Sequence, residues 1–165
     1  MFVGPGLPMP FTDTVRVDHN KIFDNNRTNT GSGSVAGVPE GTGILIFGSD
    51  NVTVDHNQIS GNNSFGIAVT GNFNVFLDPR IEPFNDGLVV ENNAITGNGA
   101  SPDPLRTFTP GADIVFLPDV FDPGPITGNP GALLLTDPDP SDNCFAMNNF
   151  GADFPPGIVG AFPCP

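Results

Sequence analysis

Three acidic side chains recur at one position of a repeated segment and have the chemistry of metal ligands. Asp18, Asp55 and Glu91 are separated by 37 and 36 residues, and each ends a short apolar stretch. Carboxylates stacked at strand spacing repel one another unless something neutralises them, and Ca²⁺ accepts several oxygen ligands. We therefore consider a Ca²⁺ site here. The alternative is a solvated row of charges, partly offset by Arg16 and Lys21.

Two histidines follow these acids, and they suggest a second metal chemistry. His19 and His56 each stand in an Asp-His-Asn sequence, whereas the third repeat has Asn92 at this position. Imidazoles on adjacent turns of a repeat can bind a transition metal. A pair without a third ordered ligand makes a weak site, and a corner histidine bonded to the backbone is the competing interpretation.

Asparagines define the repeat that would position these groups. The pattern Asn-x-Ile-x-x-Asn occurs three times, and a decayed fourth copy spans residues 143–149. Matching that copy to the second places Cys144 where Val52 stands. Self-similarity at a fixed period is typical of a stacked repeat, in which side-chain amides can bond to the neighbouring turn. We predict two columns with a spacing of about 4.8 Å: Asn20, Asn57, Asn93 and Asn149 in the first, and Asn25, Asn62 and Asn98 in the second.

The apolar residues between the asparagines predict strands rather than helices. Val52 and Val54 alternate with polar residues, Ile59 stands alone between polar neighbours, and Ile67 and Val69 alternate again. Such period-2 pieces are typical of strands, and each is too short for a helix. One turn of three strands per repeat predicts a parallel β-solenoid.

The full pattern V-x-V-D-H-N-x-I-x-x-N followed by G-I-x-V resembles the right-handed parallel β-helix repeat of the pectin-lyase-like superfamily. Segments 111–114, 143–145 and 162–164 resemble the C-terminal end of bacterial β-helix repeat proteins. The resemblance covers residues 14 to 165. It implies an all-β fold of three to four coils with loop insertions at the corners and a C-terminal cap.

This resemblance divides the chain into three parts. An irregular N-terminal arm or cap is expected over 1–13, the β-helix over 14–150 and a capping tail over 151–165. The superfamily includes polysaccharide lyases, epimerases and glycoside hydrolases as well as proteins without catalysis. Its fold therefore does not fix a function.

Four insertions fall at only two corners of the repeat. Segments 26–41 and 99–110 precede the third strand, and segments 72–86 and 117–142 follow it. Loops from the same corner of stacked turns should lie side by side. They would form walls around the third-strand face, where function is expected in a rigid scaffold.

Two further sets of residues yield predictions. Cys144, placed on the last strand, and Cys164, near the end of the chain, are expected to form a disulfide that closes the exposed strand edge; two unrelated thiols are the alternative. Acid–base catalysis by paired carboxylates is a hypothesis that a chance pair in an Asp-rich chain would also explain; its candidates are Asp86, Asp113, Asp119 and Asp122.

Composition restricts the partners. A formal charge of −13 argues against nucleic acid, and the sequence contains no transmembrane run and no export signal at Met1. Phe is the only aromatic residue type, so a strong Trp or Tyr platform for sugars is absent. We expect a secreted or cell-surface, bacterial-like module whose export signal lies outside this chain. It would bind or process a glycan, with Ca²⁺ as the candidate cofactor. The alternative is a non-catalytic structural repeat, with end-to-end self-association through an uncapped coil.

Overall fold

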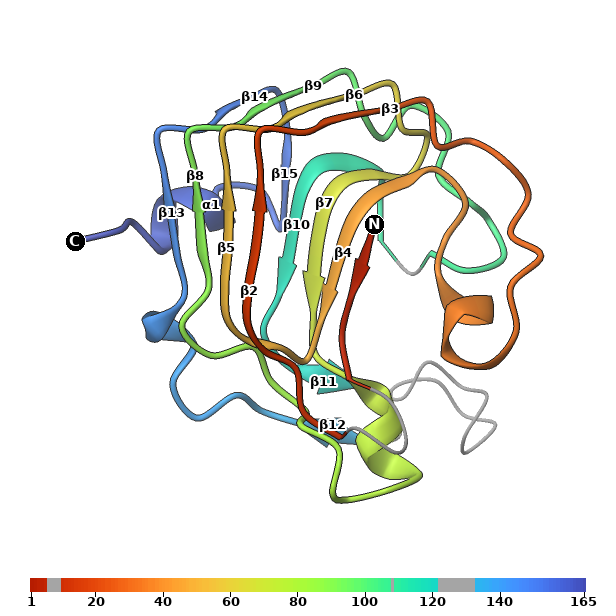
Figure 1. Ribbon diagram of the computed structural model, residues 1–165, viewed down its shortest axis with the longest axis vertical. Helices are drawn as coiled ribbons and strands as arrows, with labels where there is room; N and C mark the ends of the chain where they lie inside the picture. The colour runs from red at the N-terminus through yellow and green to blue at the C-terminus, as the bar shows by residue number, and fades with distance from the viewer. Residues whose placement is uncertain (6–9, 108, 122–132) are drawn as a thin grey trace.

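The structure is a computed structural model that describes residues 1–5, 10–107, 109–121 and 133–165. In these residues the chain forms three parallel sheets of stacked strands, short helical segments and one antiparallel strand pair (Figure 1). The fold is therefore mostly β and is compatible with a parallel β-helix. No helix in the described part has the length and apolar character needed to cross a membrane.

Each sheet collects the strands that hold the same place in successive repeats. Sheet I contains β2 (Asp13–Asp18), β5 (Asp50–Asp55), β8 (Val89–Glu91) and β13 (Cys144–Ala146). Sheet II contains β3 (Lys21–Phe23), β6 (Gln58–Ser60), β9 (Ala94–Thr96) and β14 (Asn149–Phe150). Sheet III contains β1 (Phe2–Val3), β4 (Thr42–Phe47), β7 (Phe65–Thr70), β10 (Ala112–Leu117) and β15 (Asp153–Phe154).

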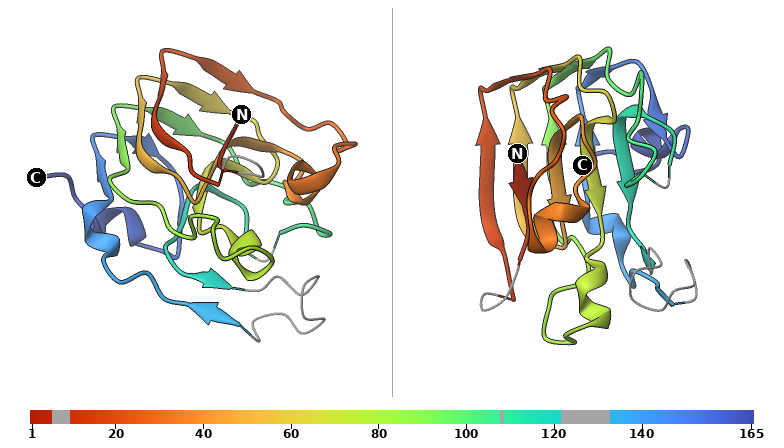
Figure 2. Two further views of the ribbon diagram at one scale, coloured as in Figure 1. Left: turned by 60° about the horizontal axis from the view of Figure 1, so that its bottom comes forward. Right: turned by 90° about the vertical axis from the view of Figure 1, so that its right-hand side faces the viewer.

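We call one set of consecutive strands from the three sheets a layer, so that β2, β3 and β4 form layer 1 and β13, β14 and β15 form layer 4. Figure 2 shows the layers stacked in chain order. The insertions at the corners carry the remaining elements: η1 (Gly33–Gly37), η2 (Phe73–Phe76), η3 (Pro140–Asp142) and the antiparallel pair β11 (Val120–Phe121) and β12 (Leu134–Leu135). Helix α1 (Ile158–Ala161) lies beside layer 4.

The apolar residue of each short strand points between the three sheets. Ile59 and Ile95 pair in sheet II and are at most 1% exposed, as are Val54 and Val90 in sheet I. Alternation along a strand sends successive side chains to opposite faces, so one residue in two joins this core. The core is a continuous column of mostly β-branched residues, with one leucine and two phenylalanines, from layer 1 to layer 4: Val17, Ile44, Ile46, Val52, Val54, Ile59, Ile67, Val69, Leu88, Val90, Ile95, Ile114, Phe116 and Phe145.

The first asparagine column runs along the corner between sheets I and II. The amide N–H and side-chain Nδ2 of Asn20 both donate to Oδ1 of Asn57, at 3.0 and 3.1 Å. Asn57 donates in the same way to Asn93, and Asn93 to Asn148. The prediction that Asn149 is the fourth member of this column was wrong, because Asn149 belongs to β14 and pairs with Ala94.

The second column follows the same rule at the next corner. Asn25 donates to Oδ1 of Asn62, and Asn62 donates to Oδ1 of Asn98. The column then ends on a carboxylate, because Asn98 donates through both its N–H and its Nδ2 to Oδ1 of Asp113. The other oxygen of Asp113 accepts from the N–H groups of Gly151 and Ala152. A carboxylate accepts but does not donate, so it terminates the column.

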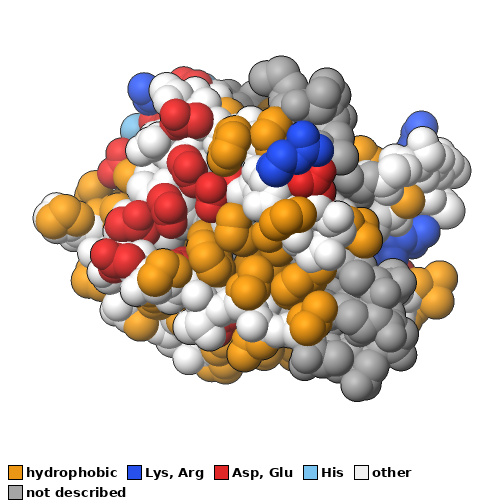
Figure 3. Space-filling model, turned by 90° about the horizontal axis from the view of Figure 1, so that it is seen from below, with side chains coloured by type: hydrophobic (Ala, Val, Ile, Leu, Met, Phe, Trp, Pro, Cys, Tyr) orange, Lys and Arg blue, Asp and Glu red, His pale blue; other side chains and the backbone are white. Residues whose placement is uncertain are grey.

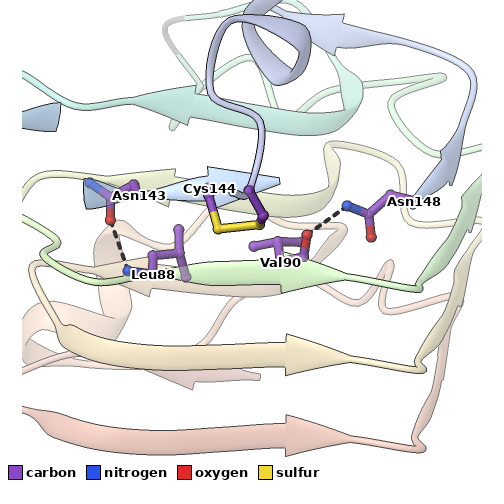
Figure 4. Close-up of a disulfide and its surroundings, with 6 residues drawn as sticks. Leu88, Val90, Asn143, Cys144 and Asn148 are labelled. Carbon is purple, nitrogen blue, oxygen red and sulfur yellow. Dashed lines mark hydrogen bonds between the residues drawn. A yellow bond between two sulfur atoms is a disulfide. The ribbon is translucent and has the colours of Figure 1, made fainter. Parts of the chain in front are cut away.

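The C-terminal tail covers the outer edge of sheet I. Phe145 forms a parallel bridge with Pro163, and the expected disulfide joins Cys144 and Cys164 (Figure 4). The expected match of Cys144 to Val52 was wrong by one residue. Cys144 pairs with Val89, and Val89 pairs with Thr53. The tail also contributes β15 to sheet III, so it extends the stack as well as capping it.

The first residues of the segment expected to form an irregular N-terminal arm or cap over 1–13 form a strand. The chain begins with β1, in which Phe2 pairs with Leu45 of β4 and Val3 with Ile46. Sheet III therefore has a strand beyond β4. In sheets I and II, β2 and β3 are the end strands of the described chain.

Candidate binding pocket

Sheet III is apolar on both of its faces. Every residue of β4 is buried: Ile44 and Ile46 join the core between the sheets, while Leu45 and Phe47 pack in a second cluster on the outer face. The run Ile44-Leu45-Ile46-Phe47 does not alternate with polar residues, which is typical of a strand buried on both sides.

The outer face lines up the same positions of three layers. Leu45 lies beside Ala68, and Ala68 lies beside Val115. Two residues further along the strands, Phe47 lies beside Thr70 and Thr70 beside Leu117. Because Ala68 and Thr70 are small, the middle layer forms the floor of a depression between larger side chains.

This depression is a pocket of about 110 Å³ over β4, β7 and β10. Its lining is mostly apolar, and the polar atoms belong mainly to a few threonines and to two charged residues. The lining residues are Gly37, Pro39, Leu45, Phe47, Phe65, Ala68, Thr70, Gly71, Phe73, Arg106, Thr107, Thr109, Val115, Leu117 and Asp119.

Phenyl rings form part of the pocket wall. The ring of Phe73 in η2 meets Phe47 edge to face, with 5.1 Å between ring centroids and 67° between planes. The ring of Phe2 in β1 also packs against Phe47, with 6.0 Å between ring centroids and 50° between planes. Edge-to-face packing fixes the orientation of each ring, so the pocket wall is preformed.

The two insertions that precede sheet III contact each other, as the sequence predicted. Arg106, in the second insertion, donates through Nε to the carbonyl of Ala36 and through a terminal nitrogen to Asp103, both at 2.9 Å, and it lies 3.4 Å from Glu40. Burial opposes ionisation of Asp103, but Arg106 and the N–H groups of Leu105 and Glu40 outweigh it and lower the pKa of this carboxyl. The insertions form one charged wall at the rim of the pocket.

The insertions that follow sheet III form the opposite wall. The N–H of Asn72 donates to the carbonyl of Pro83 at 2.7 Å, and Val120 packs closely against Gly71. A Cβ atom at Gly71 would collide with Val120, so this corner requires glycine. Asp119 lines the pocket and accepts from the N–H of Asp137 at 3.0 Å.

Acidic side chains gather at the corner that joins sheet III to sheet I. Carboxylate oxygens of Asp50, Glu82 and Asp86 lie within 4.8 Å of one another. Burial, followed by the charge of Glu82, raises the pKa of Asp50 to about 6. Figure 3, which looks onto this end of the molecule, shows acidic side chains beside a larger group of hydrophobic ones. Three carboxylates at this separation have the chemistry of Ca²⁺ ligands.

The acidic row expected to hold Ca²⁺ is stacked, but one member is already neutralised. In the register of sheet I, Asp18 lies beside Asp55 and Asp55 lies beside Glu91. Arg16 donates to both oxygens of Asp55, at 3.2 and 2.8 Å, and His56 lies 2.9 Å from one of them. The bond from His56 is the largest influence on Asp55, and together with Arg16 it lowers the pKa of this buried carboxyl against the opposing effect of burial. A cation would have to displace Arg16.

The two histidines stack as the repeat predicted. Their rings are 5.0 Å apart with 2° between planes, and Nδ1 of each faces the carboxylate of the preceding residue, Asp18 for His19 and Asp55 for His56. Both occupy left-handed corners, with φ of 56° at His19 and 55° at His56. Carboxylates, rather than the backbone, orient these rings.

The three candidate catalytic acids that the structure describes do not form a pair at the pocket. Asp113 is 3% exposed; its Oδ1 accepts from Asn98 of the second asparagine column and its Oδ2 accepts from the N–H groups of Gly151 and Ala152. Asp86 belongs to the acidic corner, Asp119 lines the pocket, and Asp122 lies outside the described residues.

The sequence predicted the position of the pocket through the paired insertions, but not its lining. The missed signal was the uninterrupted apolar run in β4. The acidic trio was missed because Asp50 starts a strand, whereas Glu82 and Asp86 come from an insertion. Comparison with known proteins adds no relative, since no family model, curated protein or solved structure matches the chain.

Proposed function

We propose that the three sheets close into a right-handed parallel β-helix of the pectin-lyase-like type, and that the protein is an exported module that binds a glycan in the pocket on sheet III. The pocket itself is the observation that carries the proposal. It is preformed, concave and mostly apolar with a few polar groups at its rim, as small-ligand sites usually are.

Closure is supported by the order of the strands. The chain visits sheets I, II and III in turn and returns to the same sheet one layer further on, always in parallel. Crossovers between parallel strands of one sheet are right-handed in nearly all proteins. The core column and the two asparagine columns fill the space that such a tube would enclose.

A sugar ring fits the chemistry of this pocket. Its C–H face can pack on the phenyl groups of Phe47 and Phe73, while its hydroxyls can bond to Thr70 on the floor and to Thr107 and Asp119 at the rim. A polyanionic sugar would be repelled by the acidic corner, so a neutral glycan is favoured.

Binding without cleavage is the form of the function that the charges favour. Hydrolysis by glycosidases of the usual type requires two carboxyl groups that flank the scissile bond. Among the described residues, the pocket lining contains one acidic residue, Asp119, and the neighbouring Asp103 and Glu40 are engaged by Arg106. The disulfide supports an oxidising compartment, in agreement with export.

A purely structural surface repeat is the second candidate, and the continuous asparagine columns favour it because they stabilise the stack and do not line the pocket. A glycan array probed with the wild-type protein separates the two. Thr70→Trp would fill the pocket from its floor, and Thr96→Trp, on the exposed face of β9, is the matched control.

We expect wild-type binding to a neutral glycan, a loss of at least about tenfold in affinity for Thr70→Trp, and a change below about twofold for the control, where tenfold corresponds to about 1.4 kcal/mol. Unfolding temperatures of the three proteins are measured in parallel. Absence of any bound glycan, or equal binding by both variants when both are folded, would contradict the proposal and favour the structural role.

A further inference from the structure

The asparagine columns have a direction, and this gives the two ends of the stack different chemistry. In the first column the N–H and Nδ2 of each asparagine donate to the Oδ1 atom of the asparagine in the next layer: Asn20 to Asn57, Asn57 to Asn93, and Asn93 to Asn148. The Nδ2 groups also donate to backbone carbonyls of the previous layer, but within the residues that the structure describes no Oδ1 of the columns accepts from a later layer. An interior Oδ1 therefore receives two hydrogen bonds from the layer before it.

In the described part of the chain, no strand of sheets I or II lies before layer 1. Among the described residues, no donor reaches Oδ1 of Asn20 or Asn25, although both residues donate to layer 2. The end of the stack at β2 and β3 thus presents two side-chain acceptors in fixed positions, together with one unpaired edge of each strand. We call this surface, formed by β2, β3 and the two asparagines, the open end.

The apolar residues of the open end are incompletely buried. Val15 and Ile22 are partly exposed, whereas their register partners Val52 and Ile59 are 0% and 1% exposed. Phe23 is 60% exposed. An exposed strand edge with apolar residues beside it is a template for another strand.

Charge also distinguishes the open end from the rest of the molecule. Residues 1–31 contain three acidic and three basic residues, whereas residues 32–165 contain fifteen acidic and two basic ones. The bases of this first part are Arg16, Lys21 and Arg27. An acidic polypeptide would be repelled over most of the surface but not here.

A second copy of this chain is a poor occupant. Head-to-tail stacking in sheet I would require the outer edge of β13, which the tail at Pro163 covers and the disulfide holds in place. Head-to-head stacking would bring acceptors against acceptors, because both copies would present Oδ1 atoms of Asn20 and Asn25.

We propose that the open end binds a different polypeptide chain that presents one layer of the same repeat, in parallel register. Its two asparagines donate N–H and Nδ2–H to Asn20 and Asn25, and its apolar residues cover Val15 and Ile22. The interaction is separate from the pocket on sheet III and does not depend on a glycan.

The test uses the intact protein and a fluorescent peptide with the sequence of residues 50–62, which contains both column asparagines of layer 2. A matched peptide carries Asn57→Asp and Asn62→Asp, which keep the shape and remove the Nδ2 donors. Fluorescence anisotropy measures both affinities, and amide shifts in an NMR spectrum locate the bound peptide.

We expect binding of the first peptide, binding of the aspartate peptide weaker by at least about tenfold, and shifts confined to β2 and β3. Val15→Lys in the protein should weaken binding by a similar factor, whereas Val35→Lys, at an exposed residue of η1, should change it by less than about twofold; tenfold corresponds to about 1.4 kcal/mol.

Three outcomes would overturn the proposal. One is equal binding of the two peptides, or no binding at a peptide concentration of about 1 mM; a dissociation constant of that size corresponds to a binding free energy of about −4 kcal/mol. The second is a set of shifts outside β2 and β3. The third is a stable dimer in sedimentation equilibrium, which would identify a second copy as the occupant. A monomer that binds the peptide at layer 1 supports the proposal.

Discussion

The two ends of the stack are built from the same repeat but finished differently. At the C-terminal end the tail adds a bridge beside β13, a disulfide holds that tail, and Asp113 terminates the second asparagine column. At the other end β2 and β3 keep an unpaired edge, and Asn20 and Asn25 keep unused acceptors in the described part of the chain.

The comparison shows that a stacked repeat does not terminate by itself. In each column, the acceptor of one layer satisfies the hydrogen-bond donors of the layer before it. A column must therefore end on an acceptor that donates nothing onward, and the last strand of a sheet needs another segment to cover its edge. Asp113 and the tail supply both, and the local sequence of the repeat supplies neither.

The largest expected effect separates the interior of a column from its open end. Asn57 donates to the carbonyls of Val17 and Asp55 and accepts from Asn20. Asn57→Val leaves several buried groups unpaired and should lower the free energy of unfolding by at least about 3 kcal/mol. Urea denaturation measures this change.

Asn20→Val is the matched variant at the open end. Water can replace its lost hydrogen bonds because Asn20 is only partly buried, so we expect a cost of about 1 kcal/mol. Equal costs for the two variants would show that the open end is covered in solution.

Removal of the disulfide should affect one end only. Cys144 and Cys164 are 20 residues apart, and in the chain-entropy model such a closure stabilises by about 3 kcal/mol. Cys144→Ser with Cys164→Ser should lower stability by up to this amount and increase hydrogen exchange in β13. Unchanged exchange in β13 would mean that the tail stays bound without its covalent link.

The smallest effect concerns two aspartates at one register position. Asp13 of layer 1 pairs with Asp50 of layer 2. Hydrogen bonds from Asn51 and Thr14 lower the pKa of Asp13, whereas burial and Glu82 raise the pKa of Asp50 to about 6. Asp50 therefore contributes stability below its unfolded pKa near 4 and loses it as pH rises through about 6. Asp13, whose pKa is lowered, contributes stability above its unfolded pKa and loses this stability as the pH falls through its folded pKa.

Asp50→Asn should accordingly raise the unfolding temperature by a few degrees at pH 7 and change it little at pH 4, and Asp13→Asn should lower it slightly at pH 7. Calorimetry at the two pH values measures both. A shift of the same sign for both variants at pH 7 would contradict the difference between the layers.

The layers could be predicted from the sequence because Asn-x-Ile-x-x-Asn fixes both columns and the core position between them. The last layer was misplaced by one residue since Asn148 and Asn149 are adjacent and both fit the spacing. Phe145 decides the register: it is 3% exposed and pairs with Val90, so Asn148 joins the column.

The site was less predictable because its parts come from different segments. The walls of the pocket could be predicted from the paired insertions. Its floor depends on small residues of β7 that lie between larger ones in β4 and β10. Asp113 carried no local signal of its role, since its partner Asn98 lies across the insertion that precedes β10.

Residue-resolved hydrogen exchange of the native protein tests the difference between the two ends most directly. We predict the slowest exchange in β5 and β8, slow exchange in β13 under the tail, and clearly faster exchange in β2 and β3. Protection of β2 equal to that of β5, or exchange in β13 faster than in β2, would contradict a stack that is closed at one end and open at the other.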